Sequence, residues 1–297
     1  MRIVFIFIDG LGIGENDPVK NPCAHPAIQI VNRFQHDSYP ASLPFGGIAK
    51  PIDCQLGIAG LPQSATGQTA LFTGINAVQL IGDHLSGFPN QRLRELLAVE
   101  SIFRKFKNMG KFPAFINAYR PIFFKFGPEA LIRFLSVTSI MNWKADLHFF
   151  NFQELESEQA IYHDFTNREL IKKGFNVPLF TAEKAGQIFA RVSQNYDLCL
   201  YEYFQTDHAG HAQEMSHAVS LLIQLEKFLF TFLSQTDLSH TLVLLTSDHG
   251  NIEDLAVKKH TNNPVPLIAW GNRKDDLLAM TETLSDVTPA LIKLIAS

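Results

Sequence analysis

The sequence predicts an α/β protein in which a mostly parallel central sheet lies between two layers of helices. Two observations support this fold class. Short apolar runs, continuous rather than alternating, are typical of strands buried on both faces of a sheet. Helical patterns lie between these runs, and strands that alternate with helices favour a three-layer α/β/α sandwich. We expect residues 1–297 to form a single domain.

Five segments have the character of buried strands, because they are short and rich in β-branched and aromatic residues. Each stands beside a turn or helix signal, which sets its expected limits. In chain order, the segments are Ile3–Ile8, Pro113–Asn117, Leu198–Phe204, Leu242–Leu245 and Leu267–Trp270.

Helical patterns occupy much of the chain between these strands. In "GLPQSATGQTALFTGINA" a loop enters a helix at Ser64. The apolar residues of Leu93–Phe106 fall roughly on one helical face, and those of Leu221–Phe232 form a clearer stripe. In "SDVTPALIKLIAS" we expect Ser285 or Asp286 to be the N-cap of a terminal helix.

The stretch from about Pro121 to Pro178 differs from the rest of the chain. It is rich in phenylalanine, carries mixed charge and has no strand rhythm. We expect residues 121–178 to form a small helical cap or insertion within the domain.

Composition excludes several classes of protein. The chain is 46% hydrophobic and 18% charged, and its net charge of −4 gives no reason to expect a nucleic-acid partner. The three cysteines show no metal-binding spacing and indicate a reducing compartment. The sequence has neither a signal-peptide pattern nor an apolar run of the ~20 residues that span a membrane. We therefore expect a cytoplasmic protein without a membrane partner, and its oligomeric state stays open.

Carboxylates and imidazoles gather where the predicted strands end. Ligands of parallel α/β sheets bind beyond the carboxyl ends of the strands, so these positions indicate a site. Such side chains are the usual ligands of Zn²⁺, Mn²⁺ and similar ions. They are Asp9 after the first strand, Asp207, His208 and His211 in "TDHAGH", Asp248 and His249 in "TSDHGN", and His260 before the last strand.

Each of these residues taken alone has a structural explanation, since an Asp after a strand is often a cap and a His in a loop is often solvated. Together they favour a metal, because like-charged carboxylates gathered without a cation cost free energy. Asp207 and His211 can face one ion from a tight loop around Gly210. The whole set exceeds the needs of one tetrahedral zinc, and two ions about 3.5–4 Å apart suit displacement at phosphorus or sulfur.

A nucleophile is expected at the helix that begins near Ser64. Thr66, Thr69 and Thr73 offer further hydroxyls in the same segment. A serine at this position can simply cap the helix. The alternative is catalytic, because a helix N-terminus holds phosphoryl groups and a nearby dication makes a hydroxyl a better nucleophile.

These segments resemble the alkaline phosphatase superfamily of dinuclear metalloenzymes, in particular the branch of cofactor-independent phosphoglycerate mutase and phosphopentomutase. The resemblance implies the alkaline-phosphatase-like form of the predicted sandwich. It spans the chain from Phe7 to near the C-terminus, in family order. The matching pieces are "FIDGLGIGE", "QSATGQTALFTG", "TDHAGH", "TSDHGNIED", "HTNNPVPLI" and "LSDVTPALIKLI".

The resemblance also implies roles for individual residues. Two divalent ions, Mn or Zn with Mg as a further option, would be bound. The implied nucleophile is Ser64, which also faces the second ion, whereas a rival alignment anchored on "GLP" chooses Thr69. By resemblance, Asp207, His211 and His260 are ligands of one ion, and Asp9, Asp248 and His249 are ligands of the other.

The chain departs from the phosphoglycerate mutases, whose large inserted domain and basic residues are not matched here. We therefore expect a phosphatase acting on a small phosphate ester through a phosphoserine, with a phosphomutase of a sugar phosphate or phosphoacid as the alternative. A phosphodiesterase, a sulfatase and an inactive metal-binding relative rank lower, and Ser64 lacks the sulfatase signature. His84, Asn167 and Arg168 are the first choices for substrate contacts.

Overall fold

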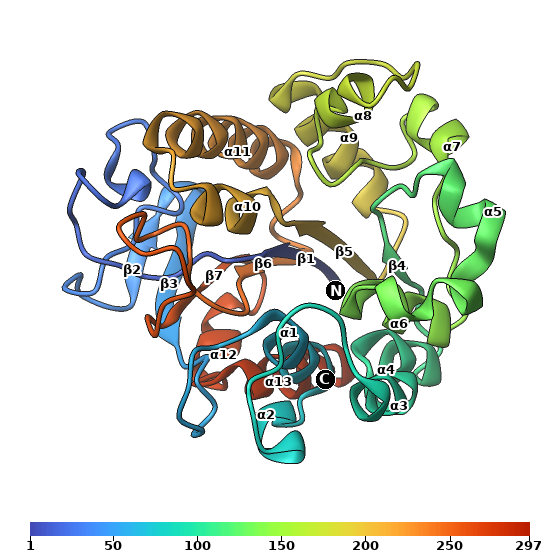
Figure 1. Ribbon diagram of the computed structural model, residues 1–297, viewed down its shortest axis with the longest axis horizontal. Helices are drawn as coiled ribbons and strands as arrows, with labels where there is room; N and C mark the ends of the chain where they lie inside the picture. Colours follow the sequence, from blue (N-terminus) through green and yellow to red (C-terminus); the bar gives the residue numbers. More distant parts are fainter.

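A seven-stranded sheet forms the centre of the computed structural model, which describes residues 1–297, and its strand order is β2-β3-β7-β6-β1-β5-β4 (Figure 1). All five predicted strands are present, which confirms them. The strands are β1 (Arg2–Ile8), β2 (Ala41–Leu43), β3 (Gly47–Ile52), β4 (Pro113–Phe115), β5 (Leu198–Tyr203), β6 (Thr241–Thr246) and β7 (Val265–Gly271).

The core of the sheet is parallel, as predicted. Strand β1 pairs in parallel with both β5 and β6, and β4 pairs in parallel with β5. Strand β7 runs antiparallel to β6 and to β3. The sequence missed β2 and β3 because β2 has only three residues and β3 carries Lys50 and Pro51, which do not read as a buried strand.

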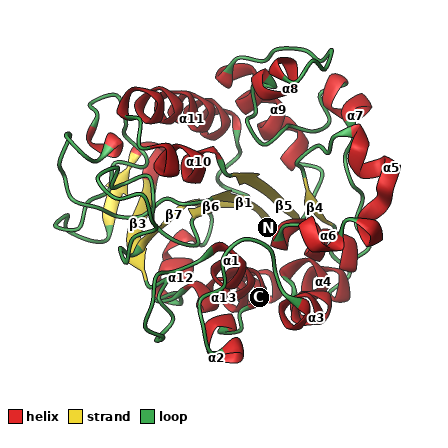
Figure 2. Ribbon diagram, in the orientation of Figure 1, coloured by secondary structure: helices red, strands yellow, loops and turns green.

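Helices cover both faces of the sheet and complete the predicted α/β/α sandwich (Figure 2). Helices α9 and α11 pack together on one face, and α1 packs with α13 and α3 on the other. The helices are α1 (Ser64–Thr73), α2 (Ala77–Ile81), α3 (Gln91–Glu100), α4 (Ile102–Asn108), α5 (Pro121–Ala130), α6 (Val137–Lys144), α7 (Phe152–Glu156), α8 (Arg168–Lys172), α9 (Ala182–Ser193), α10 (Gln205–Ala212), α11 (Met215–Gln235), α12 (Lys274–Ala279) and α13 (Leu284–Ala296), with 3-10 turns at Pro22–Ala24, Pro44–Gly46 and Ile132–Phe134.

Two helix limits differ from prediction because side chains cap the backbone. The stripe over Leu93–Phe106 is two helices, since extended Ser101 ends α3 and its hydroxyl accepts from the Arg104 amide to start α4. The terminal helix is capped by Thr283 rather than by Ser285 or Asp286. Asp286 instead accepts the backbone amide of Thr283 and completes a capping box.

The segment 121–178 contains helices α5 to α8 and no strand. Helix α6 packs against α3, α1 and α4, so it belongs to the lower helical layer in Figure 1. Helix α5 lies farther out, and several of its apolar side chains are exposed. No helix of the structure has both the length and the apolarity that crossing a membrane requires.

The direction of β7 explains how His260 reaches the edge where the parallel strands end. Because β7 is antiparallel to β6, its first residue lies beside the last residues of β6. The loop that leads into β7 therefore lies beside the loops that leave β1, β5 and β6. Residues from four strand connections can meet there.

Candidate metal centre

Asp9, Asp248 and His249 form a first group of side chains, here called the buried cluster. Asp9 follows β1, and Asp248 and His249 follow β6, its parallel neighbour, so the sheet register brings the three together. One ligand atom from each lies within 4.8 Å of the others. All three residues are buried, and Asp248 and His249 are fully so.

Polar contacts in the buried cluster leave some atoms without partners. His249 Nε2 lies 3.3 Å from Asp9 Oδ1 and 3.5 Å from Asp248 Oδ2. The Gln68 amide donates to Asp9 Oδ2 at 3.3 Å and to Asp248 Oδ2 at 3.0 Å. Asp9 Oδ1 makes no hydrogen bond although it is buried, which is unusual for a carboxylate oxygen.

The electrostatics of the buried cluster suit a divalent cation. Burial, and then the charge of Asp248, hold the pKa of Asp9 well above its usual range. Burial alone would lower the pKa of His249, but the carboxylates of Asp248 and Asp9 outweigh it and raise the pKa to about 10. The cluster thus attracts positive charge, and its oxygen and imidazole donors suit Zn²⁺ or Mn²⁺. These residues fit a metal ion.

Asp207, His211 and His260 form a second group, the outer cluster, in which His211 is exposed and Asp207 is partly so. Asp207 and His211 lie in helix α10, which corrects the predicted tight loop. Their spacing of four residues places them on one helical face. Asp207 Oδ2 lies 3.4 Å from His211 Nε2, and Asp207 Oδ1 lies 3.4 Å from His260 Nε2.

Backbone carbonyls orient both histidines of the outer cluster. His211 Nδ1 is 2.9 Å from the carbonyl oxygen of Lys258, and His260 Nδ1 is 2.9 Å from that of Pro62. A carbonyl only accepts, so each Nδ1 carries the proton and each Nε2 keeps its lone pair for a metal. Burial raises the pKa of Asp207, but hydrogen bonding to His260 and nearby positive charge bring it below its usual range.

The two clusters share a wall. The rings of His249 and His260 are stacked, with centroids 3.7 Å apart and planes at 14°. Gly10 adopts φ +71°, and a Cβ there would lie 2.9 Å from Asp207. The glycine therefore lets the loop after Asp9 approach Asp207 of the outer cluster closely. The Asn251 amide donates to Asp207 Oδ1 at 2.6 Å and so ties the loop after β6 to α10. Two ions held here would be neighbours.

Ser64 is the first residue of α1 and faces the buried cluster. Its Oγ lies 3.0 Å from His249 Nε2. The first backbone amides of a helix have no partner within the helix. In α1 they also have no side-chain cap, because Gln63, the extended residue before Ser64, does not accept a hydrogen bond from them. Gly67 lets the helix approach, since a Cβ there would lie 2.9 Å from the Asp248 carbonyl oxygen. Ser64 thus combines a hydroxyl, a positive helix end and a set of candidate ligands.

The other hydroxyls of α1 are occupied by its own backbone. Thr69, the alternative nucleophile, is fully buried and donates to the Ala65 carbonyl oxygen at 2.6 Å. Thr73 donates to the Thr69 carbonyl oxygen at 2.6 Å, and Thr66 to that of Gln63 at 3.2 Å. Ser64 is therefore the hydroxyl of this helix that meets the clusters.

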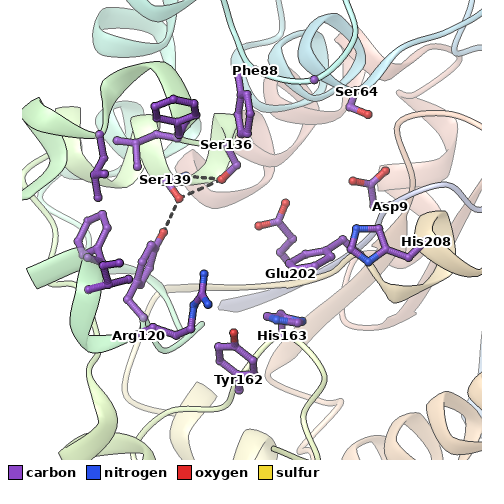
Figure 3. Close-up of a pocket in the computed structure, with 18 of the residues that line it drawn as sticks. Asp9, Ser64, Phe88, Arg120, Ser136, Ser139, Tyr162, His163, Glu202 and His208 are labelled. Atoms are coloured by element: carbon purple, nitrogen blue, oxygen red, sulfur yellow. Dashed lines mark hydrogen bonds between the residues drawn. The ribbon is translucent and has the colours of Figure 1, made fainter. Parts of the chain in front are cut away.

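A cavity of about 770 Å³ opens from Ser64, Asp9 and Asp207 towards the segment 121–178 (Figure 3). Arg120 and Glu202 point into it. A smaller cavity of about 550 Å³ also borders Ser64 and is lined by His211 and His260. Ser64 therefore lies where two open spaces meet.

Glu202 is a buried carboxylate in the larger cavity. It lies at the end of β5, and Thr138 of α6 donates to its Oε2 at 2.7 Å. The Asn117 side chain bonds both the amide and the carbonyl of Glu202, which fixes the strand there. Burial raises the pKa of Glu202 to about 7, opposed by the bond from Thr138, and the charge of Asp248 adds to the rise.

Sequence reasoning missed Gln68 and Asn251 as neighbours of the clusters. A signal existed for Gln68, which lies four residues after Ser64 and hence on the same helical face. Asn251 follows His249 closely enough to have been considered. Glu202 stands just before the metal loop in the sequence, and its contact with Thr138 in the cavity depends on how α6 packs.

His84, Asn167 and Arg168 line neither of the two cavities at Ser64. His84 Nε2 bonds the carbonyl oxygen of Ile58 at 3.1 Å. The Asn167 amide donates to the carbonyl oxygen of Pro178 at 2.8 Å, and Arg168 begins helix α8 with its side chain exposed. The structure does not bring these residues to the clusters, and we assign them no contact with substrate.

Comparison with known proteins places this fold and site in context. A structure of the PH0037 protein from Pyrococcus horikoshii covers 99% of the chain and 96% of its own, with a TM-score of 0.57 and 15% identity. Alkaline phosphatase from the Antarctic bacterium TAB5 covers 99% and 98%, with a TM-score of 0.57 and 14% identity. At these identities the likeness shows the fold alone.

Curated relatives match a shorter part of the sequence. A 2,3-bisphosphoglycerate-independent phosphoglycerate mutase from Vesicomyosocius okutanii is 32% identical over 108 residues, which are 34% of this chain but 21% of that protein. A mutase of the same name from Desulforudis audaxviator is 26% identical over 124 residues, 40% of this chain and 24% of its own. The chain thus matches about a fifth of the first relative's length. The family model described as Metalloenzyme superfamily matches residues 1–297, so the chain belongs to the metalloenzyme superfamily and has an alkaline-phosphatase-like fold.

Proposed function

We propose that this protein is a phosphoryl-transfer enzyme with two divalent ions, Mn or Zn with Mg as a further option, that hydrolyses a small phosphate ester through a phosphoserine at Ser64. The observation that carries the proposal is the 3.0 Å approach of Ser64 Oγ to His249 Nε2 at the N-terminus of α1. A nucleophile, a helix dipole and two ligand clusters meet there. The family supplies the metal dependence.

The chain's residues have separate tasks in this reaction. Asp9, Asp248 and His249 would hold one ion beside Ser64, and the outer cluster would hold the other. Bound divalent ions supply the positive charge that lowers the pKa of a coordinated hydroxyl and offsets charge on the phosphoryl group. The amides at the start of α1, where Ser64 lies, have no side-chain cap and can bind phosphoryl oxygens.

Two displacements at phosphorus complete the cycle. The Ser64 hydroxyl loses its proton to solvent, its oxygen bonds to phosphorus, and the ester P–O bond breaks. The electron pair of that bond goes to the departing alkoxide, which takes a proton from water. Water then attacks phosphorus, the bond to Ser64 Oγ breaks, and that oxygen regains a proton as phosphate leaves.

Replacing Ser64 tests the nucleophile. We expect Ser64→Ala to lower kcat for phosphate release by at least about 10⁴-fold, because a nucleophile is lost, while the metal content stays at the wild-type value. The matched control is Thr69→Val, which removes the alternative hydroxyl from the same helix without changing its volume greatly. Near-normal activity of Ser64→Ala, or loss of activity only in Thr69→Val, would contradict the assignment.

A phosphomutase is the second candidate, favoured by the names of the curated relatives. In that case a second hydroxyl of the substrate, rather than water, takes the phosphoryl group from Ser64. Product analysis separates the two reactions, since free phosphate indicates hydrolysis and an isomerised ester indicates transfer. The cavity at Ser64 is open on two sides, which favours water as the acceptor.

A further inference from the structure

Four apolar side chains at the outer part of the larger cavity form a surface that we call the phenyl wall. They come from different segments, because Phe88 precedes α3, Ile122 and Phe126 belong to α5, and Phe134 lies in the turn after it. The rings of Phe88 and Phe134 meet edge to face, with centroids 6.2 Å apart. The wall therefore joins the loop after α2 to the segment 121–178 across one cavity.

The four side chains of the phenyl wall are largely exposed to solvent when no other molecule covers them. Phe134 is 70% exposed, Ile122 54%, Phe126 52% and Phe88 50%. Apolar side chains gathered in this way favour a partner that removes them from water. Because the wall lines the same cavity as Ser64 and Asp9, a molecule bound at Ser64 can provide that cover.

Few charged groups of this cavity are free to bind a second anion. Lys173 lies 3.0 Å from Glu169 and is already paired. Burial and the nearby charge of Lys173 hold the pKa of His163 well below its usual range, so its ring is neutral at pH 7. Arg120 is then the cavity's one permanent cation without an ion pair, and Glu202 lies between it and Asp9 in Figure 3. This balance of charged groups disfavours a substrate that carries further anionic groups beside its phosphoryl group.

We propose that the substrate is a phosphate ester of an apolar alcohol, with its phosphoryl group at Ser64 and its hydrocarbon body against the phenyl wall. The inference deepens the proposed function and rests on it. Ser64, Asp9 and Asp207 bind and react at the polar end of the cavity, while Phe88, Phe126 and their neighbours select the alcohol at the other end.

The test compares two esters that differ only in apolar size. Propyl phosphate and 3-phenylpropyl phosphate are both esters of primary alcohols, so their alkoxide leaving groups are of similar basicity and their intrinsic reactivities are similar. We expect kcat/KM for the phenylpropyl ester to be at least about tenfold higher, since discrimination by added apolar groups in a fitted pocket begins near that size. Equal values, or a preference for 3-phosphoglycerate over both esters, would overturn the inference.

Two variants on one helix locate the preference. Phe126→Ser removes a ring of the wall, and we expect the ratio of the two kcat/KM values to fall at least about threefold. Phe124→Ser is the matched control, because Phe124 is also on α5 and 46% exposed but does not line the cavity. If both variants change the ratio equally, the wall does not select the alcohol.

A binding measurement separates failure of this inference from failure of the proposed function. Calorimetric titration of the metal-loaded protein with propylphosphonate and 3-phenylpropylphosphonate needs no turnover. Tighter binding of the phenylpropyl compound by about tenfold, without Ser64-dependent hydrolysis of either ester, would keep the apolar ligand and reject the phosphatase. Hydrolysis that depends on Ser64, with equal affinities and equal kcat/KM values, would reject the apolar alcohol and keep the phosphatase.

Discussion

The buried cluster and the outer cluster hold similar side chains, but the fold builds them differently. Asp9, Asp248 and His249 stand at the ends of β1 and β6, two adjacent strands at the centre of the sheet. The outer cluster stands on the short helix α10 and on the loop before β7, and its His211 is exposed. The buried cluster lies in the core, whereas the outer cluster extends from buried His260 to exposed His211.

This difference in position indicates which cluster must hold its side chains most accurately. Ser64 lies against the buried cluster, so the proposed nucleophile is positioned by residues that follow the central strands. The outer cluster borders the smaller cavity and can exchange ligands or water with solvent. We therefore expect the buried cluster to govern formation of the phosphoserine and the outer cluster to govern binding of the phosphoryl group and its release.

Loss of one ligand from each cluster should give the largest effects. Charge from a bound ion is worth several kcal/mol in the transition state, and each 1.36 kcal/mol is tenfold in rate. We expect Asp248→Asn and Asp207→Asn each to lower kcat/KM by at least about 10³-fold. Steady-state kinetics over a series of Mn²⁺ and Zn²⁺ concentrations will measure both.

Rescue by added metal should distinguish the two variants. Asp207→Asn leaves the exposed His211 in place, and the outer cluster borders the smaller cavity, so high metal concentration should restore part of its activity. Asp248→Asn alters a fully buried site beside Ser64, and added metal should not restore it. Equal rescue of the two variants would remove the functional distinction between the clusters.

Removal of metal by a chelator should affect the outer cluster before the buried cluster. We expect this difference to be smaller than the effects of the two substitutions. The outer cluster contains exposed His211, whereas Asp248 and His249 of the buried cluster are fully buried. A chelator should therefore release metal in two phases of one equivalent each, the outer ion first. Stopped-flow detection of the released metal gives the phases, and Asp207→Asn should lack the fast one. A single phase of two equivalents would indicate that the clusters open together.

The candidate ligands could be named from sequence because each lies within a few residues of a recognisable strand. Asp9 and Asp248 follow apolar runs whose ends are plain in the sequence. Helix α10 could not be predicted from the sequence, because Gly210 and several polar residues lower its intrinsic helix propensity. Packing against α11 stabilises this helix in the folded protein. The phenyl wall was also missed, because it brings together Phe88 and Phe134, whose rings meet only after α5 and α6 have packed.

Glu202 lies outside the buried cluster, but the charge of Asp248 contributes to its pKa. Burial, with a contribution from Asp248, raises its pKa from 4.5 to about 7 in the folded protein. A carboxyl group with a raised folded pKa destabilises the folded state progressively as pH rises from the unfolded value to the folded one. The cost is absent below pH 4.5 and complete above pH 7.

We therefore expect Glu202→Gln to raise the unfolding free energy of the metal-free protein by about 3 kcal/mol at pH 8 and by less than about 0.5 kcal/mol at pH 4.5. The glutamine oxygen can still accept the Thr138 hydrogen bond, so packing is kept. Denaturant unfolding at the two pH values measures the difference. A cation in the buried cluster would offset the charge of Asp248 and reduce the gain. A gain that is the same at both pH values would mean that the ionisation of Glu202 is not its cause.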